Sequence, residues 1–361
     1  MMAFGQRYRV TIFGSSHGPE VGAVVEGIPA GTTIDPLEIQ RDLDRRRPVG
    51  RRLATRRQEE DRLIVDSGVI SGTSDGSPFR AHVANTDVRR EPYDRTRDTP
   101  RPGHADFPAR VRYGSDADLS GGGIFSGRMT VGLVIGGAIA KRLLRAKGID
   151  LLAFTRSIGP VDAQVPEGES LVTLRERAAS NEVGTPDLDA AVRMEEAIGG
   201  VRREGDSLGG VVEVRTEGLP VGLGEPFFDS IESSVAHLAF SVPAVKAVEF
   251  GAGFRGARMR GSEHNDPFVW VDGAVRTESN NAGGVLGGLS TGMPLVYRVA
   301  VKPTSSIARP QRTVNLAEKS STTIVVTGRH DPCIVPRAVV VLEAVTAIAL
   351  ADLGLRGGFL P

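Results

Sequence analysis

The apolar stretch from Met129 to Ala140 places the strongest limit on the fold. It is too short to cross a lipid bilayer, which needs about 20 apolar residues. We therefore predict a helix buried in the core. Three glycines within it would weaken an isolated helix: Gly132, Gly136 and Gly137. Their presence predicts that the backbone of another element packs close against this face of the helix.

The composition is that of a large globular protein. A chain of 361 residues can bury a sizeable core. Its 44 basic residues balance 44 acidic ones, so any binding of anions must come from local clusters of charge. The single cysteine, Cys333, excludes an internal disulfide and a cysteine-rich metal site, and we expect it to be a small buried side chain. Residues 1–13 contain no signal-peptide pattern, so we expect a cytoplasmic protein that binds no membrane.

The spacing of apolar residues predicts strands over residues 8–13, 21–28 and 63–70. Asp35 is a typical N-cap for a helix from Pro36 to about Arg47. By contrast, residues 85–120 show little periodicity, and we expect a long loop of the kind that often carries function.

The two halves of the chain contain similar short segments. Glu26–Gly31 reads Glu-Gly-Ile-Pro-Ala-Gly, and Glu217–Gly222 reads Glu-Gly-Leu-Pro-Val-Gly. Each follows a valine-rich strand and precedes an aspartate, Asp35 or Asp229, that opens a predicted helix and then another strand. Chance similarity of turn residues is one explanation and internal duplication is the other. Duplication would make residues 1–361 a single pseudo-symmetric domain.

Two short turns carry histidines. Gly14–Gly18 contains His17, and Arg101–Asp106 contains His104. In each turn glycine leaves the backbone open to a ligand. Since histidine exchanges protons near neutral pH, the pair indicates acid–base chemistry, although either residue alone is explained by an ordinary polar loop.

Eight arginines and no lysine occur between residues 41 and 57. The planar guanidinium matches the geometry of phosphate and carboxylate, so the run favours recognition of a small polyanion. Nucleic acid could use the same groups, but few aromatic residues, zero net charge and the absence of a known nucleic-acid motif argue against it.

A glycine loop, Gly121–Gly123, leads into Ser126, Arg128 and the apolar helix. Free backbone N–H groups at such a helix start accommodate phosphate. The spacing matches neither a P-loop nor a dinucleotide-binding loop.

Three segments nearer the C-terminus carry polar groups in turns: residues 279–284, 302–306 and 328–333. Ordinary turn chemistry explains each of them, and Lys302–Ser306 could equally hold a phosphate. His330 and Asp331 are too few and too close together for a metal site, and we expect no metal.

Taken in order, these segments resemble the chorismate synthase family from about Tyr8 to Leu353. The matching pieces are Gly14–Gly18, Asp42–Pro48, Arg101–Asp106, Gly121–Thr130, Glu204–Ser207, Gly222–Pro226, Ser279–Gly288, Lys302–Ser306 and Gly328–Cys333. Each piece is moderately specific, and their order and spacing together are highly so.

The resemblance implies a fold and a reaction. The fold is an α+β sandwich in which helices lie between two antiparallel sheets, usually assembled as a homotetramer. The reaction converts 5-enolpyruvylshikimate 3-phosphate to chorismate and inorganic phosphate by a 1,4-anti elimination. It uses reduced FMN, which is not consumed and which comes from a separate supply or from reduction by the protein itself with NADPH.

The resemblance also implies roles for individual residues. His17 would protonate the leaving phosphate, His104 would face the flavin, and Asp331 would lie near flavin N5. Arginines would bind the substrate anions: Arg46, Arg52, Arg101, Arg128 and Arg337. Flavin contacts would come from Ser126, Ala244, Gly287, Lys302, Pro303, Thr304, Ser305, Ser306 and Arg329.

Two positions depart from the family pattern. Ser15 replaces a glutamate in the first histidine turn, and Ile124-Phe125 stands where Arg-Ser is usual in the flavin loop. Ile124 removes a basic side chain where the flavin is expected, so we predict weaker FMN affinity without a change in reaction type. The departures leave open a related lyase acting on another cyclohexene phosphate, and the arginine run leaves open a nucleic-acid-binding protein.

Overall fold

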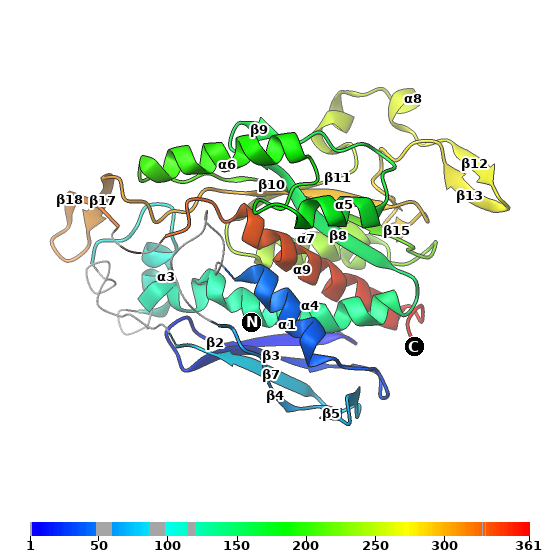
Figure 1. Ribbon diagram of the computed structural model, residues 1–361, viewed down its shortest axis with the longest axis horizontal. Helices are drawn as coiled ribbons and strands as arrows, with labels where there is room; N and C mark the ends of the chain where they lie inside the picture. Colours follow the sequence, from blue (N-terminus) through cyan, green and yellow to red (C-terminus); the bar gives the residue numbers. More distant parts are fainter. Residues whose placement is uncertain (1, 48–59, 87–97, 115–119, 327, 329) are drawn as a thin grey trace.

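The structure, a computed structural model, describes residues 2–47, 60–86, 98–114, 120–326, 328 and 330–361. Two five-stranded antiparallel sheets enclose a layer of helices (Figure 1). The first sheet, in the order β1-β2-β3-β7-β4, consists of β1 (Ala3–Phe4), β2 (Arg9–Gly14), β3 (Glu20–Glu26), β7 (Phe79–Ala84) and β4 (Ile64–Ser67). The second, in the order β11-β16-β10-β8-β9, consists of β11 (Val245–Phe250), β16 (Leu295–Val301), β10 (Gly210–Glu217), β8 (Asp150–Ile158) and β9 (Val161–Asp162).

Helices fill the space between the sheets and cover one outer face. The inner helices are α1 (Pro36–Arg46), α4 (Thr130–Arg145), α7 (Ile231–Ser241) and α9 (Val335–Arg356). The outer face of the second sheet is covered near β8 and β9 by α5 (Leu171–Ala179) and α6 (Leu188–Arg203). This is the predicted sandwich, with an additional helical layer outside the second sheet (Figure 1).

The glycines of α4 confirm the prediction of close packing. A Cβ at Gly137 would fall 2.3 Å from the Cα of Ala344 in α9, and a Cβ at Gly132 would fall 2.5 Å from the carbonyl oxygen of Gly22 in β3. The helix therefore contacts backbone on two sides, α9 on one and the first sheet on the other. Any larger residue would separate these layers.

Helix α9 packs against α4 and forms the core together with it. By length and hydropathy alone it could cross a membrane, but 94% of its most apolar window is buried inside the protein. Cys333, just before α9, is a buried free thiol as expected, and burial, reinforced by nearby Asp331, raises its pKa to about 12.

The two halves share one topology. In the first, β2-β3-β7-β4 are neighbours in that order, with α1 between β3 and β4 in sequence; in the second, β8-β10-β16-β11 are neighbours, with α7 between β10 and β11. The glycines at matching positions of the two similar segments also have the same backbone conformation. The φ angles are 80° and 79° at Gly27 and Gly218, and 83° and 88° at Gly31 and Gly222. This agreement favours duplication over chance.

Some predicted elements were wrong in detail. Residues 85–120 are not wholly irregular, because α3 (Asp106–Tyr113) lies within them and the 3-10 turn η1 (Ser120–Phe125) begins at their last residue. The strand predicted over residues 63–70 is split at Gly68 into β4 and the short β5 (Val69–Ile70). The N-cap of α7 is Ser230, whose side chain accepts the N–H of Ser233, and not Asp229.

The described residues also form smaller elements. Four two-stranded hairpins are formed by β5 and β6 (Thr73–Ser74), β12 (Phe268–Val271) and β13 (Ala274–Thr277), β14 (Val285–Leu286) and β15 (Leu289–Ser290), and β17 (Gln311–Asn315) and β18 (Ser320–Ile324). Short helices and turns are η2 (Gly127–Met129), η3 (Phe227–Asp229), η4 (Gly253–Arg258) and α8 (Gly261–His264).

Candidate active site

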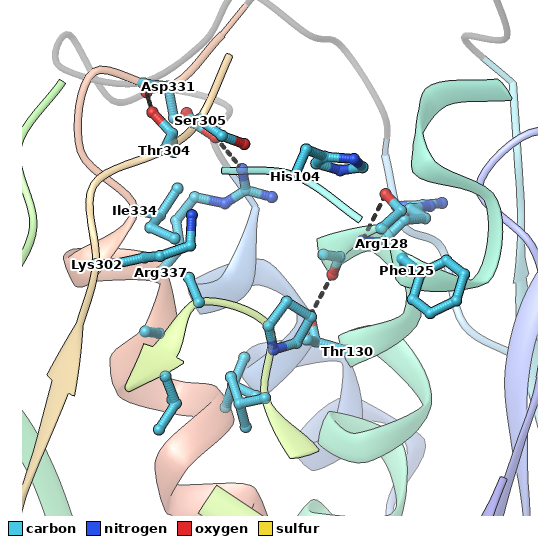
Figure 2. A pocket seen from close by; sticks show the side chains of 18 of the residues that line it. His104, Phe125, Arg128, Thr130, Lys302, Thr304, Ser305, Asp331, Ile334 and Arg337 are labelled. Carbon is cyan, nitrogen blue, oxygen red and sulfur yellow. Dashed lines mark hydrogen bonds and ion pairs between the residues drawn. The ribbon is translucent and has the colours of Figure 1, made fainter. Parts of the chain in front are cut away.

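A cavity of about 620 Å³ lies at the end of the sandwich where α4 and α9 begin. Its walls come from the second histidine turn, the glycine loop, the end of α7, residues 302–306 and the start of α9. In Figure 2, Lys302 and Arg337 lie on one side of the cavity, and His104 and Arg128 lie across from them. Two helices thus direct their N-terminal ends toward this region, which favours anionic ligands.

The first histidine turn connects β2 to β3. Gly14 ends β2 with a left-handed φ of 94°, and the turn then carries His17, only 6% exposed. The hydroxyl of Ser16 lies 3.0 Å from His17 Nδ1. Asn85 fastens the turn by donating from Nδ2 to the carbonyls of Ser15 and Gly18, at 3.0 and 2.8 Å.

The second histidine turn precedes α3 and is held by Asp106. One carboxylate oxygen of Asp106 lies 2.5 Å from His104 Nδ1, and the pair of oxygens also accepts two bonds from the Arg101 guanidinium, at 2.7 and 2.8 Å. Burial alone would raise the pKa of Asp106, but the bonds from Arg101 and His104 outweigh it and hold this pKa well below its usual value. The charged carboxylate therefore fixes the imidazole through Nδ1, while Nε2 lies 3.4 Å from a terminal nitrogen of Arg101.

The glycine loop lies between the two histidines. A Cβ at Gly121 would fall 1.9 Å from Cε1 of His17, and a Cβ at Gly122 would fall 3.4 Å from Cε1 and Nε2 of His104. Both glycines have positive φ, 60° and 90°. The loop thus needs glycine at both positions for its backbone conformation, and at position 121 also for its contact with the His17 imidazole.

Three arginines from three helices meet at the inner wall. Arg46 at the end of α1 and Arg128 in η2 both donate to the carboxylate of Asp61. Arg337 in α9 donates from Nε to the carbonyl of Arg46, at 3.1 Å, and from its terminal nitrogen to Asp331. Burial and the neighbouring guanidinium charges lower the pKa of Arg46 to about 10, against the opposing effect of Asp61.

Residues 302–306 supply further hydrogen-bond donors to the cavity wall. Lys302 donates from Nζ to the carbonyl of Gly103, at 3.0 Å, and burial together with the charge of Lys246 lowers its pKa. Thr304 and Ser305 lie near Asp331 in Figure 2, and Thr304 donates to the Asp331 carbonyl at 2.9 Å.

The structure brings most of the predicted site residues to this cavity. Those that line it are His104, Asp331, Arg46, Arg128, Arg337, Ser126, Ala244, Lys302, Thr304, Ser305 and Ser306. His17 does not line the cavity but packs against Gly121, which does. Pro303 lies in sequence between Lys302 and Thr304, which both line the cavity. Arg52 and Arg329 lie outside the described residues.

Two predicted residues lie elsewhere. The Arg101 guanidinium is not part of the cavity lining, because it is engaged by Asp106 and donates to the hydroxyl of Ser306 at 3.1 Å. Gly287 lies in the turn between β14 and β15, again outside the lining. The arginine run also disperses: Arg41 contacts Asp35 on the surface, and of the run's described members only Arg46 reaches the cavity.

Sequence reasoning missed two residues that organise the site. Asp61 joins two arginines, and Asn85 joins the first histidine turn to Arg128 by accepting from its Nε at 2.9 Å. Asp61 lay in a charged stretch and Asn85 in a segment without periodicity, so neither stood out. An acid close in sequence to an all-arginine run was the available signal for Asp61.

The family model for chorismate synthase matches residues 8–355. The chain belongs to the chorismate synthase family. Among proteins named chorismate synthase, that of Dehalococcoides mccartyi is 47% identical over 359 residues, covering 99% of this chain and 98% of the relative. That of Korarchaeum cryptofilum is 49% identical, covering 97% and 96%. A solved structure described as the crystal structure of chorismate synthase superposes with a TM-score of 0.79 at 30% identity, covering 98% of this chain and 93% of the other.

Proposed function

We propose that the cavity at the start of α4 and α9 is the active site in which this protein converts 5-enolpyruvylshikimate 3-phosphate to chorismate and inorganic phosphate. The protein is a chorismate-forming lyase of the shikimate pathway, as its family membership implies. One observation carries the assignment to this cavity: the glycine loop contacts His17 and His104, while arginines from three helices meet beside it.

The residues of the cavity fit a flavin mononucleotide beside the substrate. The volume of about 620 Å³ lies within the range of natural ligand sites. Lys302 and the hydroxyls of Ser305 and Ser306 suit a phosphate, and the apolar side chains of Ile334 and Val341 suit a planar ring. When bound, reduced FMN supplies the electron-rich partner that the allylic substrate requires.

The arginines provide the charge that the substrate needs. The substrate carries two carboxylates and a phosphate, and guanidinium groups bind such oxygens with paired hydrogen bonds. Arg46 is 2% exposed, and its Nε has no hydrogen-bond partner among the described residues. This spare donor supports a role for Arg46 in binding an anion.

The histidines divide the proton chemistry. His17 protonates the phosphate as it leaves, with Ser16 fixing the ring through Nδ1. His104, fixed through Nδ1 by Asp106, presents Nε2 toward the glycine loop and the flavin position. Asp331, which accepts a hydrogen bond from Arg337, would help to accept the proton that the substrate ring loses.

The direct test is turnover without oxygen. The protein is incubated with reduced FMN and 5-enolpyruvylshikimate 3-phosphate, and chorismate and phosphate are measured. His17→Ala and His104→Ala should each slow turnover by about 100-fold or more, the usual effect of losing a positioned acid or base. His264→Ala, in α8 and outside the cavity lining, is the matched control. Absence of wild-type turnover would contradict the proposal.

The assembly and the flavin supply belong to the same proposal. We expect a cytoplasmic homotetramer, supported by aromatic side chains exposed on η4 and β12, which extend away from the sandwich: Phe254 at 78%, Phe268 at 66% and Trp270 at 78% (Figure 1). Light scattering should give four times the 38.2 kDa chain mass. Adding NADPH and oxidised FMN to the same assay separates self-reduction of the flavin from an external supply.

A further inference from the structure

We propose that Asp61 is a positioning residue for substrate binding: its carboxylate bridges Arg46 and Arg128 and holds the two guanidinium groups as one anion site. The inference rests on the proposed function. Asp61 Oδ2 accepts from Arg46 and Oδ1 accepts from Arg128, so each oxygen serves a different arginine. The Asp61 side chain is 1% exposed and itself lines the cavity.

The bridge reduces the repulsion between buried guanidinium charges. Arg46 and Arg128 are both nearly buried, and Arg337 adds a third guanidinium beside them. Like charges in a low-dielectric site repel unless a counterion lies between them. Although burial tends to raise the pKa of Asp61, the two arginines lower it overall, so the carboxylate is charged near neutral pH.

The bridge leaves a donor on Arg46. Arg128 is more fully engaged, because it donates from Nε to Asn85 and from its two terminal nitrogens to Asp61 and to the carbonyl of Ala84. Arg46 donates from one terminal nitrogen to Asp61, while its buried Nε has no hydrogen-bond partner among the described residues. Asp61 therefore fixes one edge of the Arg46 guanidinium and leaves another available.

The backbone around Asp61 is built to hold it there. Asp61 has a left-handed φ of 45°, uncommon outside glycine. Gln40, on α1, donates to the Asp61 carbonyl at 3.2 Å and accepts the N–H of Leu63 at 2.9 Å. The same helix thus carries Arg46 and the side chain that fixes the position of its partner.

The test is Asp61→Asn, which keeps the shape, removes the charge and uses a residue that tolerates the left-handed conformation. Affinity for 5-enolpyruvylshikimate 3-phosphate, measured by calorimetry, should fall by roughly 30-fold or more, as expected when one partner of a buried charge pair is lost. Affinity for reduced FMN should stay within about twofold, since Asp61 bonds to Arg46, Arg128 and Gln40 and not to the residues proposed to hold that ligand.

Asp352→Asn is the matched control. Asp352 is also buried, but it accepts the backbone N–H groups of residues 6–8 far from the cavity. It should lower the melting temperature without changing substrate affinity. If Asp61→Asn behaves in the same way, its role is merely structural and the inference is overturned.

Asp61→Glu provides a second variant. It keeps the charge, so its loss of substrate affinity should be smaller than that of Asp61→Asn; a larger loss overturns the inference. Should the Asn variant fail to fold, Asp61→Gln is compared with Asp61→Glu, which has the same length and keeps the charge, and equal substrate affinity in the two variants overturns the inference.

Wild-type turnover tests the proposed function separately. If the wild type binds no substrate, the proposed function fails, and inorganic phosphate then becomes the calorimetric probe of the arginine pair. Weaker phosphate binding by Asp61→Asn than by wild type supports the bridge, and equal binding overturns it.

Discussion

Gly121 lies against His17 so closely that a Cβ at position 121 would fall 1.9 Å from Cε1 of the imidazole. At the neighbouring Gly122, a Cβ would lie at ordinary van der Waals distance, 3.4 Å, from the imidazole of His104. The two histidines are 87 positions apart in the sequence. In the fold, each packs against one of two successive glycines. The loop sets the spacing of the acid–base groups, and the contact with His17 dictates glycine at position 121.

Gly121→Ala should displace His17 and slow turnover by about 100-fold, because a shift of about 1 Å in a catalytic group has an effect of this size. It should also cost about 1–2 kcal/mol of folding free energy, since φ at this position is 60°. Gly148→Ala is the control: φ there is 74° and the Cβ would meet nothing within 4 Å. If both variants lose stability equally and turn over alike, the contact with His17 is irrelevant to catalysis.

Asp106→Asn should slow turnover by about 10- to 100-fold with little change in substrate affinity. The amide can still occupy the space, but it no longer pairs as a charge with Arg101 or holds His104 through Nδ1. Steady-state kinetics over a range of pH distinguish this from general damage. We expect a lower kcat and an altered pH profile at a similar KM; a rise in KM alone would refute the orienting role.

Ile124→Arg should raise the affinity for reduced FMN by about tenfold. Ile124 lines the cavity and is 42% exposed, so a guanidinium placed there could reach an anionic ligand from partly solvated surroundings. An anaerobic flavin titration gives the dissociation constants. Ile70→Arg adds the same charge to the exposed β5 and should have no effect. Equal gains in both variants would indicate a long-range effect of charge.

Local patterns predicted the layers of the fold well. The glycines of α4 implied a close backbone neighbour, and Ala344 of α9 is that neighbour. Asp35 implied a helix start, and its side chain accepts the N–H of Leu37. These features depend on residues near each other in sequence or on sterics that one residue type reveals.

Long-range pairing within the site was beyond such patterns. Arg101 was assigned to the substrate, yet its guanidinium is occupied by Asp106 and Ser306, and Ser306 is 205 residues away. Asp61 gave no local signal, because its importance arises only when α1 and η2 bring two arginines to it. The chemistry of an arginine follows from its sequence, whereas the partner that engages it follows from the tertiary fold.

Glu343→Gln should destabilise the protein at neutral pH by about 3–5 kcal/mol, the usual cost of removing one partner from a buried ion pair. Glu343 is 3% exposed; it accepts two bonds from Arg45, at 2.6 and 2.8 Å, and one from Lys141 at 3.3 Å. Burial alone would raise the pKa of Glu343, but Arg45 and Lys141 outweigh it and lower the pKa from 4.5 to about 2.

The direction of the pH effect follows from that shift. A carboxyl whose pKa is lowered by folding binds fewer protons in the folded state, so its contribution is complete above pH 4.5 and is lost as the pH falls toward about 2. The contribution lost is on the order of 3 kcal/mol. Urea unfolding of wild type and Glu343→Gln should therefore show a stability difference that shrinks over this range. Glu176→Gln, on the exposed face of α5, should show no such dependence, and a constant difference for Glu343→Gln would disprove the linkage.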